Sequence, residues 1–190
     1  MWRRNKKGEQ KAIVVGPWGG HRGTNWDDRS YDGVREITLM HARCINSIRV
    51  AYDKNGKPIT AKKHGGVGGV KIAEIKLQFP DEFLTTVTGH YFPMVHGGSQ
   101  VTRSLTFKGN WSPFGPFGVE EGTLFFFPTE GGQIIGFKGR GGWYLDAIGF
   151  HIAKIETPKV EQKAPQRFNR GFASTISFAA PRDKSTKSPA

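Results

Sequence analysis

The most constraining feature of this chain is a two-residue alternation of apolar and polar side chains. It is clearest over residues 72–79, where apolar side chains stand at positions 73, 75, 77 and 79. That period predicts a β-strand with one buried face, and no window of a dozen residues sustains the 3.6-residue period of a helix. Turn signals separate the alternating runs, such as Asn55-Gly56, which favours a type I′ hairpin. The pattern predicts an all-β sandwich, barrel or prism.

The predicted strands are short and are separated by loops rich in glycine and proline. The strand segments are 12–15, 34–39, 48–52, 59–61, 72–79, 84–91, 105–108, 124–127, 134–137 and 148–155. The loop segments include 16–23, 64–69, 93–99 and 113–118.

The length of 190 residues suits one domain of ordinary size with additional tails. Only 36% of the residues are hydrophobic and 26 are glycine, as in β folds with many turns or in domains with disordered ends. We predict a disordered basic leader over residues 1–11, a folded domain over residues 12–156 and a disordered basic tail over residues 157–190. Prolines scattered among Ser, Thr and Lys are the reason for the tail prediction.

The formal net charge of +12 is concentrated at the ends of the chain. Residues 1–11 carry five Lys/Arg against one acid, and residues 157–190 carry seven against two, whereas residues 12–156 carry 16 against 13. A nucleic-acid-binding domain would gather basic residues on its folded face, so nucleic acid is not the expected partner. Basic tails could hold a polyanion, a sulfated glycan or a nucleic acid, with strong salt dependence, although solvated tails are the simpler interpretation.

Cysteine, histidine and hydropathy patterns narrow the biochemical class. Cys44 is the single cysteine, and Ile45 and Ile48 beside it indicate a buried thiol. The six histidines are scattered with no metal-ligand spacing, so we expect no metal and no other cofactor. Residues 1–7 are charged without a following apolar segment, which argues against a secretory signal. No run approaches the roughly 18 apolar residues of a membrane span. These features favour a cytoplasmic or nucleocytoplasmic protein.

The segment 139–150, GRGGWYLDAIGF, is the strongest candidate for a binding site. Three glycines in four residues precede Asp146 and an alternating apolar strand. Glycines permit positive φ and the close approach of a second molecule, so exposed backbone N–H donors would lie beside one carboxylate acceptor. That set of donors and acceptors suits a neutral polyhydroxylated ligand such as a sugar. The simpler alternative is an ordinary hairpin in which Asp146 is a turn residue.

Four motifs follow one another along the chain: GPWGG at 16–20, HGGVGG at 64–69, FGPFG at 114–118 and GFKGRGGWYLDAIG at 136–149. Together they resemble the jacalin-related lectins over residues 12–156, the whole predicted domain. The resemblance implies a β-prism of three four-stranded Greek-key sheets with pseudo-threefold symmetry. That symmetry would explain why glycine-rich segments recur at intervals of roughly fifty residues.

The resemblance also implies a sugar site between the first glycine loop and the Gly-x-x-x-Asp motif at 142–146. The residues it assigns to carbohydrate binding are Gly19, Gly20, Gly142, Trp143, Tyr144 and Asp146. Asp146 would accept hydrogen bonds from O4 and O6 of a hexose, and the N–H groups of Trp143 and Tyr144 would donate to the ring oxygen and O6. The N–H of Gly20 would donate to O3, and the other two glycines would keep the approach free of side chains.

The sugar preference is suggested by the continuity of residues 16–23. Galactose-binding members of the processed type expose a new amino terminus at this loop, so the resemblance favours mannose- or glucose-containing glycans and glycoproteins, with galactose as the alternative. Some mannose-type members carry a second site with two aspartates. Arg43 and Asn46 occupy those positions here, so we expect one site per chain. Weak single-sugar affinity makes multivalency useful, which predicts a homo-oligomer.

An enzyme is the main rival class, and the sequence argues against it. Glycoside hydrolysis needs two carboxylates about 5 to 9.5 Å apart, and the motif around Asp146 supplies one. The acidic pairs at 27–28 and 120–121 are better explained as solvated turns, and no Gly-x-Ser-x-Gly nucleophile motif occurs. We therefore expect non-covalent binding without catalysis.

Overall fold

The computed structural model describes residues 12–155, and in that range it contains strands but no helix that could cross a membrane. The strands are β1 (Ile13–Gly19), β2 (Thr24–Asp27), β3 (Gly33–His41), β4 (Ile45–Lys54), β5 (Lys57–Thr60), β6 (His64–Gly65), β7 (Lys71–Lys76), β8 (Leu84–Pro93), β9 (Gln100–Gly109), β10 (Pro113–Gly118), β11 (Thr123–Pro128), β12 (Gly132–Gly141) and β13 (Leu145–Lys154). The predictions for residues 1–11 and 157–190 lie outside the described residues.

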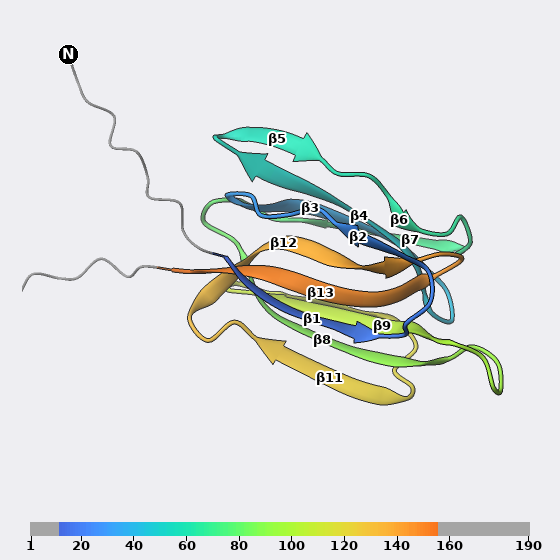
Figure 1. The fold of residues 1–190 in the computed structure, drawn as a ribbon. Coiled ribbons are helices and arrows are strands. Elements are labelled where there is room, and N and C mark those ends of the chain that lie inside the picture. Colours follow the sequence, from blue (N-terminus) through green and yellow to red (C-terminus); the bar gives the residue numbers. More distant parts are fainter. Residues whose placement is uncertain (1–11, 156–190) are drawn as a thin grey trace, which may run out of the picture. The chain divides into compact units, whose positions relative to one another are not determined.

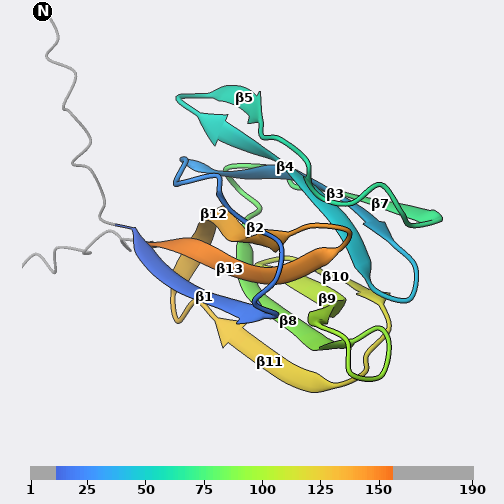
Figure 2. The same cartoon turned by 45° about the vertical axis from the view of Figure 1, so that its right-hand side comes forward.

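The strands form three antiparallel sheets around one core (Figure 1, Figure 2). Sheet I has the order β1-β13-β12-β2, sheet II the order β5-β4-β3-β7, and sheet III the order β10-β9-β8-β11. The short strand β6 also pairs with β4, next to β5, so one edge of sheet II is built from two pieces. In sheets II and III the fourth strand returns to lie beside the first, which is the Greek-key order.

Sheet I obtains the same order from both ends of the folded range, because β12 and β13 are its inner hairpin and β1 and β2 its outer strands. The inner hairpins of all three sheets also share irregularities. Each hairpin has one register shift near the start of its first strand and one near the end of that strand. The shifts follow Ile134 and Arg140 in sheet I, Val34 and Met40 in sheet II, and Leu84 and His90 in sheet III. The all-β prism with pseudo-threefold symmetry that the sequence predicted is thus confirmed.

A repeated backbone hydrogen bond identifies equivalent positions in the three sheets. The N–H of Gly20 donates to the carbonyl of Asp146 at 2.8 Å, and the N–H of Gly66 donates to the carbonyl of Asn46 at 2.9 Å. In sheet III the N–H of Val119 donates to the carbonyl of Arg103, also at 2.9 Å. Asp146, Asn46 and Arg103 therefore occupy corresponding places.

Each sheet contributes its inner face to the common core. The inner side chains that lie fully buried include Phe137, Ile148 and Phe150 from sheet I, Ile37, Leu39 and Ile48 from sheet II, and Leu84, Leu105 and Phe107 from sheet III. Burying a side chain of this size contributes about 1.5–3 kcal/mol. Phe137 packs edge-on against both Phe150 and Phe107, with centroid separations of 5.5 and 6.2 Å. This core fixes the sheets and therefore the loops at their ends.

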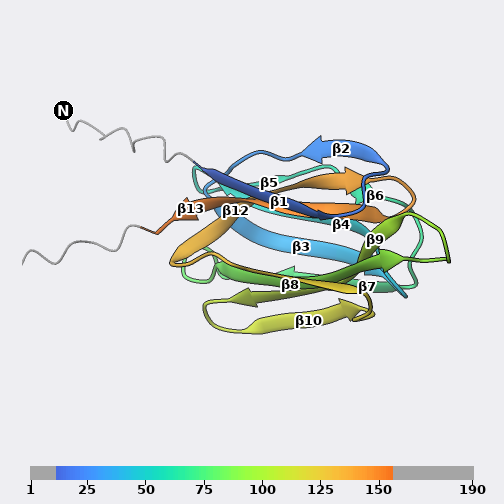
Figure 3. The same cartoon turned by 60° about the horizontal axis from the view of Figure 1, so that its bottom comes forward.

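The four segments predicted as loops belong wholly or partly to strands, since β6 and the last residue of β8 also lie in them. Residues 113–118 form β10, an outer strand of sheet III (Figure 3). Residues 16–19 complete β1. Both strands shift register around a proline, between Phe114 and Phe117 and between Val15 and Trp18. Because both are edge strands, a proline without an N–H is tolerated there, and its presence did not exclude a strand.

Candidate functional site

The candidate site lies at the end of sheet I, where a three-residue turn joins β12 to β13. Gly139 and Gly141, predicted to lie in the loop, are paired residues of β12, and the turn consists of Gly142 to Tyr144. The N–H of Gly142 closes the turn by donating to the carbonyl of Tyr144 at 3.0 Å. Asp146 follows as the second residue of β13.

A cavity of about 660 Å³ opens at this turn. Its lining contains four of the predicted site residues, Gly142, Trp143, Tyr144 and Asp146. The other lining residues come from three further loops and from β4 and β9: Arg22, Gly23, Asn46, Val67, Gly68, Met94, Val95, Gly98, Ser99 and Val101. We call this space the Asp146 cavity.

Asp146 is the acidic group of the cavity and is only 6% exposed. Burial raises the pKa of its carboxyl above the ordinary value, and the positive charge of Arg140 opposes that rise. Within residues 12–155 no side chain or backbone N–H donates to this carboxylate. A carboxylate can accept about four hydrogen bonds, so both oxygens are available to a ligand that brings hydroxyl groups.

Residues with backbone donors line the same cavity as this acceptor. Trp143 and Tyr144 are turn residues whose N–H groups reach no backbone carbonyl in the described range. Gly23 lies directly against the carboxylate: a Cβ on Gly23 would collide with Oδ2 of Asp146 and would lie 2.7 Å from the carbonyl carbon of Gly141. Its φ of +71° is also one that side-chain-bearing residues rarely adopt. Only glycine at this position leaves space between the loop and Asp146.

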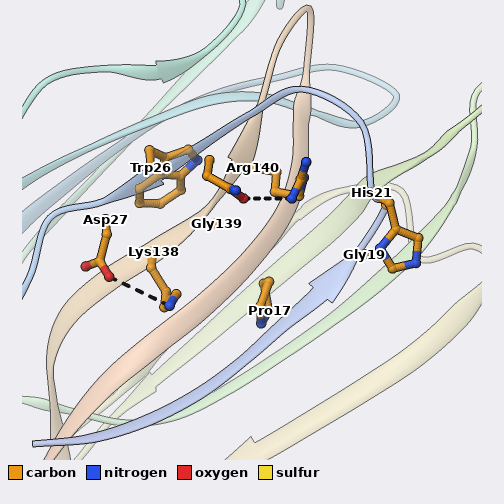
Figure 4. Close-up of a pocket in the computed structure, with 10 residues that line it drawn as sticks. Pro17, Gly19, His21, Trp26, Asp27, Lys138, Gly139 and Arg140 are labelled. Carbon is orange, nitrogen blue, oxygen red and sulfur yellow. Dashed lines mark hydrogen bonds and ion pairs between the residues drawn. The ribbon is translucent and has the colours of Figure 1, made fainter.

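Gly19 and Gly20 are placed differently from the expectation. They line a second cavity of about 580 Å³ with Lys138, Gly139 and Arg140, seen in Figure 4. The N–H of Gly20 is already donated to the backbone carbonyl of Asp146, so it is not available to a sugar O3. The first glycine loop does meet the Asp146 loop, but Gly23 is the glycine that faces the carboxylate.

The internal repeat contains a signal that could have identified Gly23. Gly66 makes the same backbone bond as Gly20, and Gly69, three residues later, packs against Oδ1 of Asn46 as Gly23 packs against Asp146. The identical three-residue spacing in both glycine loops therefore marks the second glycine of each pair as the one beside the side chain.

Arg140 holds the Gly23 loop in place. Its Nε donates to the carbonyl of Arg22 at 3.1 Å, Nη1 donates to Oδ1 of Asn25 at 2.7 Å, and Nη2 makes a longer contact of 3.4 Å with the carbonyl of Gly23. A planar guanidinium with several donors suits such a multiple contact. The loop that limits the Asp146 cavity is thereby fastened to β12.

Part of the lining of the Asp146 cavity is apolar. Val67, Val95 and Trp143 line it and are 79%, 69% and 85% exposed. Exposed large apolar side chains grouped beside convergent polar groups are typical of a ligand site. The cavity thus combines hydrogen-bond acceptors and donors with apolar side-chain surfaces, and this combination matches the two kinds of surface on a sugar.

The described residues offer little for other chemistry. No group of three or more His, Cys, Asp or Glu side chains in residues 12–155 is arranged to hold a metal ion. Cys44 is buried as predicted, and burial raises the pKa of its thiol to about 11 although Arg103 opposes the rise. A thiol with that pKa is protonated at neutral pH and is a poor nucleophile.

Comparison with known proteins identifies the family. The jacalin-like lectin domain matches residues 15–151. The chain belongs to the jacalin-related lectins. These are non-enzymatic carbohydrate-binding proteins, so the enzyme alternative is excluded and the sequence-based family assignment is confirmed.

Named relatives show what this lectin is similar to. It is 56% identical to jacalin-related lectin 19 of Arabidopsis thaliana over 158 residues, covering 83% of this chain and 90% of the relative. It is 44% identical to a galactose-specific lectin of Morus indica over 153 residues, covering 78% and 96%. The structure of a mannose-specific jacalin-related lectin from Morus nigra in complex with mannose superposes with a TM-score of 0.72 at 47% identity, covering 79% and 99%.

Proposed function

We propose that this lectin binds mannose- and glucose-type glycans reversibly through the Asp146 cavity, with one site per chain. The observation that carries the proposal is a buried carboxylate without a hydrogen-bond donor from residues 12–155, facing a cavity beside Gly23 and the Trp143–Tyr144 turn. The solved neighbour from Morus nigra, described as mannose-specific and bound to mannose, supports this choice of sugar.

Galactose is the second candidate, because the relative from Morus indica is described as galactose-specific. Mannose and galactose differ in the orientation of O2 and of O4, and O4 is one of the hydroxyls expected to donate to Asp146. A titration with methyl α-mannoside, methyl α-glucoside and methyl α-galactoside separates them. Mannoside and glucoside should bind more tightly than galactoside; the reverse order would replace mannose by galactose in the proposal.

The expected affinity follows from the polar groups in the cavity. Two hydrogen bonds to the Asp146 carboxylate at about 2 kcal/mol each, and three from the N–H groups of Gly23, Trp143 and Tyr144, which reach no backbone carbonyl in the described range, at about 1 kcal/mol each, give about 7 kcal/mol. Association costs at least about 4 kcal/mol. About 3 kcal/mol remains, which corresponds to a dissociation constant of a few millimolar for one sugar unit.

Such weak single-site binding supports a second element of the proposal, a homo-oligomer that binds branched glycans multivalently. Light scattering of the full chain, combined with binding to mannose-coated surfaces at different densities, tests it. A monomer whose binding does not depend on the density of mannose would contradict it.

We also propose a cytoplasmic or nucleocytoplasmic location, which imaging of the tagged full-length protein tests.

A further inference from the structure

The second cavity has its own chemistry. Residues of the β1 end, β2 and β12 surround it, including Pro17, His21, Trp26 and Lys138 (Figure 4). It is separated from the Asp146 cavity by the first glycine loop, since Gly20 and His21 line one space and Arg22 and Gly23 line the other. Its volume of about 580 Å³ is within the range of small-ligand sites.

Four polar side chains project from the outer face of sheet I into this cavity. Lys138 and Arg140 are two residues apart in β12, so they share a face. Their direct partners in β2 are Asp27 and Asn25, on the same face. Trp26, between these two in β2, also lines the cavity, and its ring stacks on His64. The cavity is consequently polar on its β2–β12 wall.

The acceptors on this wall are largely occupied. Oδ1 of Asp27 accepts from the N–H of Arg29 at 2.8 Å and lies 2.7 Å from Nε2 of His151. Oδ1 of Asn25 accepts from Arg140 at 2.7 Å. The wall therefore has few free acceptors with which to bind a neutral hydroxyl-rich ligand as Asp146 can.

The donors are less occupied. Nζ of Lys138 forms an ion pair with Oδ2 of Asp27 at 3.7 Å, which is beyond hydrogen-bond distance, so its N–H groups can still donate to a ligand. Arg140 uses three of its five N–H groups on the glycine loop and Asn25, which leaves two. His21 is exposed at the rim. The free donors of this wall are cationic and outnumber its one free carboxylate oxygen, Oδ2 of Asp27, so the ligand that matches them carries anionic oxygens.

We propose that this cavity, formed by Lys138, Arg140 and the Gly19–His21 segment, is a second binding site that accepts an acidic saccharide, a sugar unit bearing a carboxylate or a sulfate. The anionic group lies between the side chains of Lys138 and Arg140, and the sugar ring extends toward the Pro17 side of the cavity. The site belongs to the folded domain and does not depend on the basic segments at the chain ends.

The test is an NMR titration of the full chain with methyl glucuronide, a sulfated glucoside and neutral methyl glucoside. Both acidic sugars should shift the resonances of Gly139 and Lys138, and Lys138→Gln should weaken their binding about tenfold, the loss expected for one charge-assisted hydrogen bond. Methyl α-mannoside affinity should not change in this variant. Lys54→Gln, at the exposed end of β4 in sheet II, removes the same charge and should have no effect.

Three results would overturn the proposal. The first is an equal loss in the Lys138→Gln and Lys54→Gln variants, which would show a general charge effect. The second is displacement of the acidic sugars by saturating methyl α-mannoside, which would place them in the Asp146 cavity. The third is inorganic sulfate that binds as tightly as the sulfated glucoside, which would leave no role for the sugar ring. The first and third results do not depend on whether mannoside itself binds, so they can be told apart from a failure of the proposed mannose site.

Discussion

Replacing Asp146 by Asn separates binding from folding, because the two side chains have nearly the same shape. The carboxylate contributes two charge-assisted hydrogen bonds of about 2 kcal/mol each to a bound sugar, and the amide oxygen could keep one neutral bond of about 1 kcal/mol. The expected loss is about 3 kcal/mol, or a factor of about 100 in the dissociation constant. A few-millimolar site would then become undetectable.

The stability of the unliganded protein should change in the other direction. Burial raises the pKa of Asp146, with Arg140 opposing, so the ionised carboxylate lowers the free energy of unfolding at neutral pH. Asp146→Asn removes that charge, and its thermal midpoint by circular dichroism should equal or exceed that of the wild type. NMR titration with methyl α-mannoside measures the binding. An unchanged titration would refute the reasoning, and so would a variant that no longer folds.

Three further predictions concern the same cavity. Gly23→Ala should abolish mannoside binding because the new Cβ collides with Asp146. The control Gly56→Ala, at a similar φ of +78° with no atom within 4 Å, should lose about 1 kcal/mol of stability and keep binding. Equal mannoside affinities in the two variants would contradict this. Mannoside affinity should be highest at neutral pH, where Asp146 is ionised. It should fall on acidification at a higher pH than for an ordinary aspartate, because burial raises the pKa of Asp146 although the charge of Arg140 opposes that rise. A pH-independent affinity in NMR titrations argues against the role of the Asp146 carboxylate. Arg140→Gln should weaken mannoside binding about fivefold by releasing the Gly23 loop; calorimetry showing wild-type affinity would exclude this holding role.

The fold was predictable because its determinants are local. Alternation of side chains and recurrent glycine loops indicated short strands in a repeated unit, and the three Greek-key sheets confirm it. What the sequence did not indicate is pairing at the edges. The segments 113–118 and 24–27 have no clear alternation, yet both are strands because each lies beside a longer, well-defined strand, β9 or β12. Long-range pairing, which no local pattern contains, decided their structure.

The site was predictable on one side only. Gly142 to Asp146 is a single contiguous motif, so its residues necessarily lie together, and the structure places them in one cavity. The loop that faces this motif comes from the other end of the folded range. Whether Gly20 or Gly23 lies against the Asp146 carboxylate depends on which of them donates its N–H to the Asp146 carbonyl. That choice is made by the contact of two distant segments.

The pseudo-threefold repeat leads to a final prediction about stoichiometry. The positions equivalent to Asp146 hold Asn46, which is neutral and 6% exposed, and Arg103, which is 3% exposed. Arg103 fills its own place in the repeat, since it donates to the carbonyls of Arg43 and Pro93 and to Oε2 of Glu121. Neither position supplies a free carboxylate, so calorimetric titration with a monovalent mannoside should give one bound sugar per chain. Two equivalent sugars per chain would show that a carboxylate is not required, and the role assigned to Asp146 would be wrong.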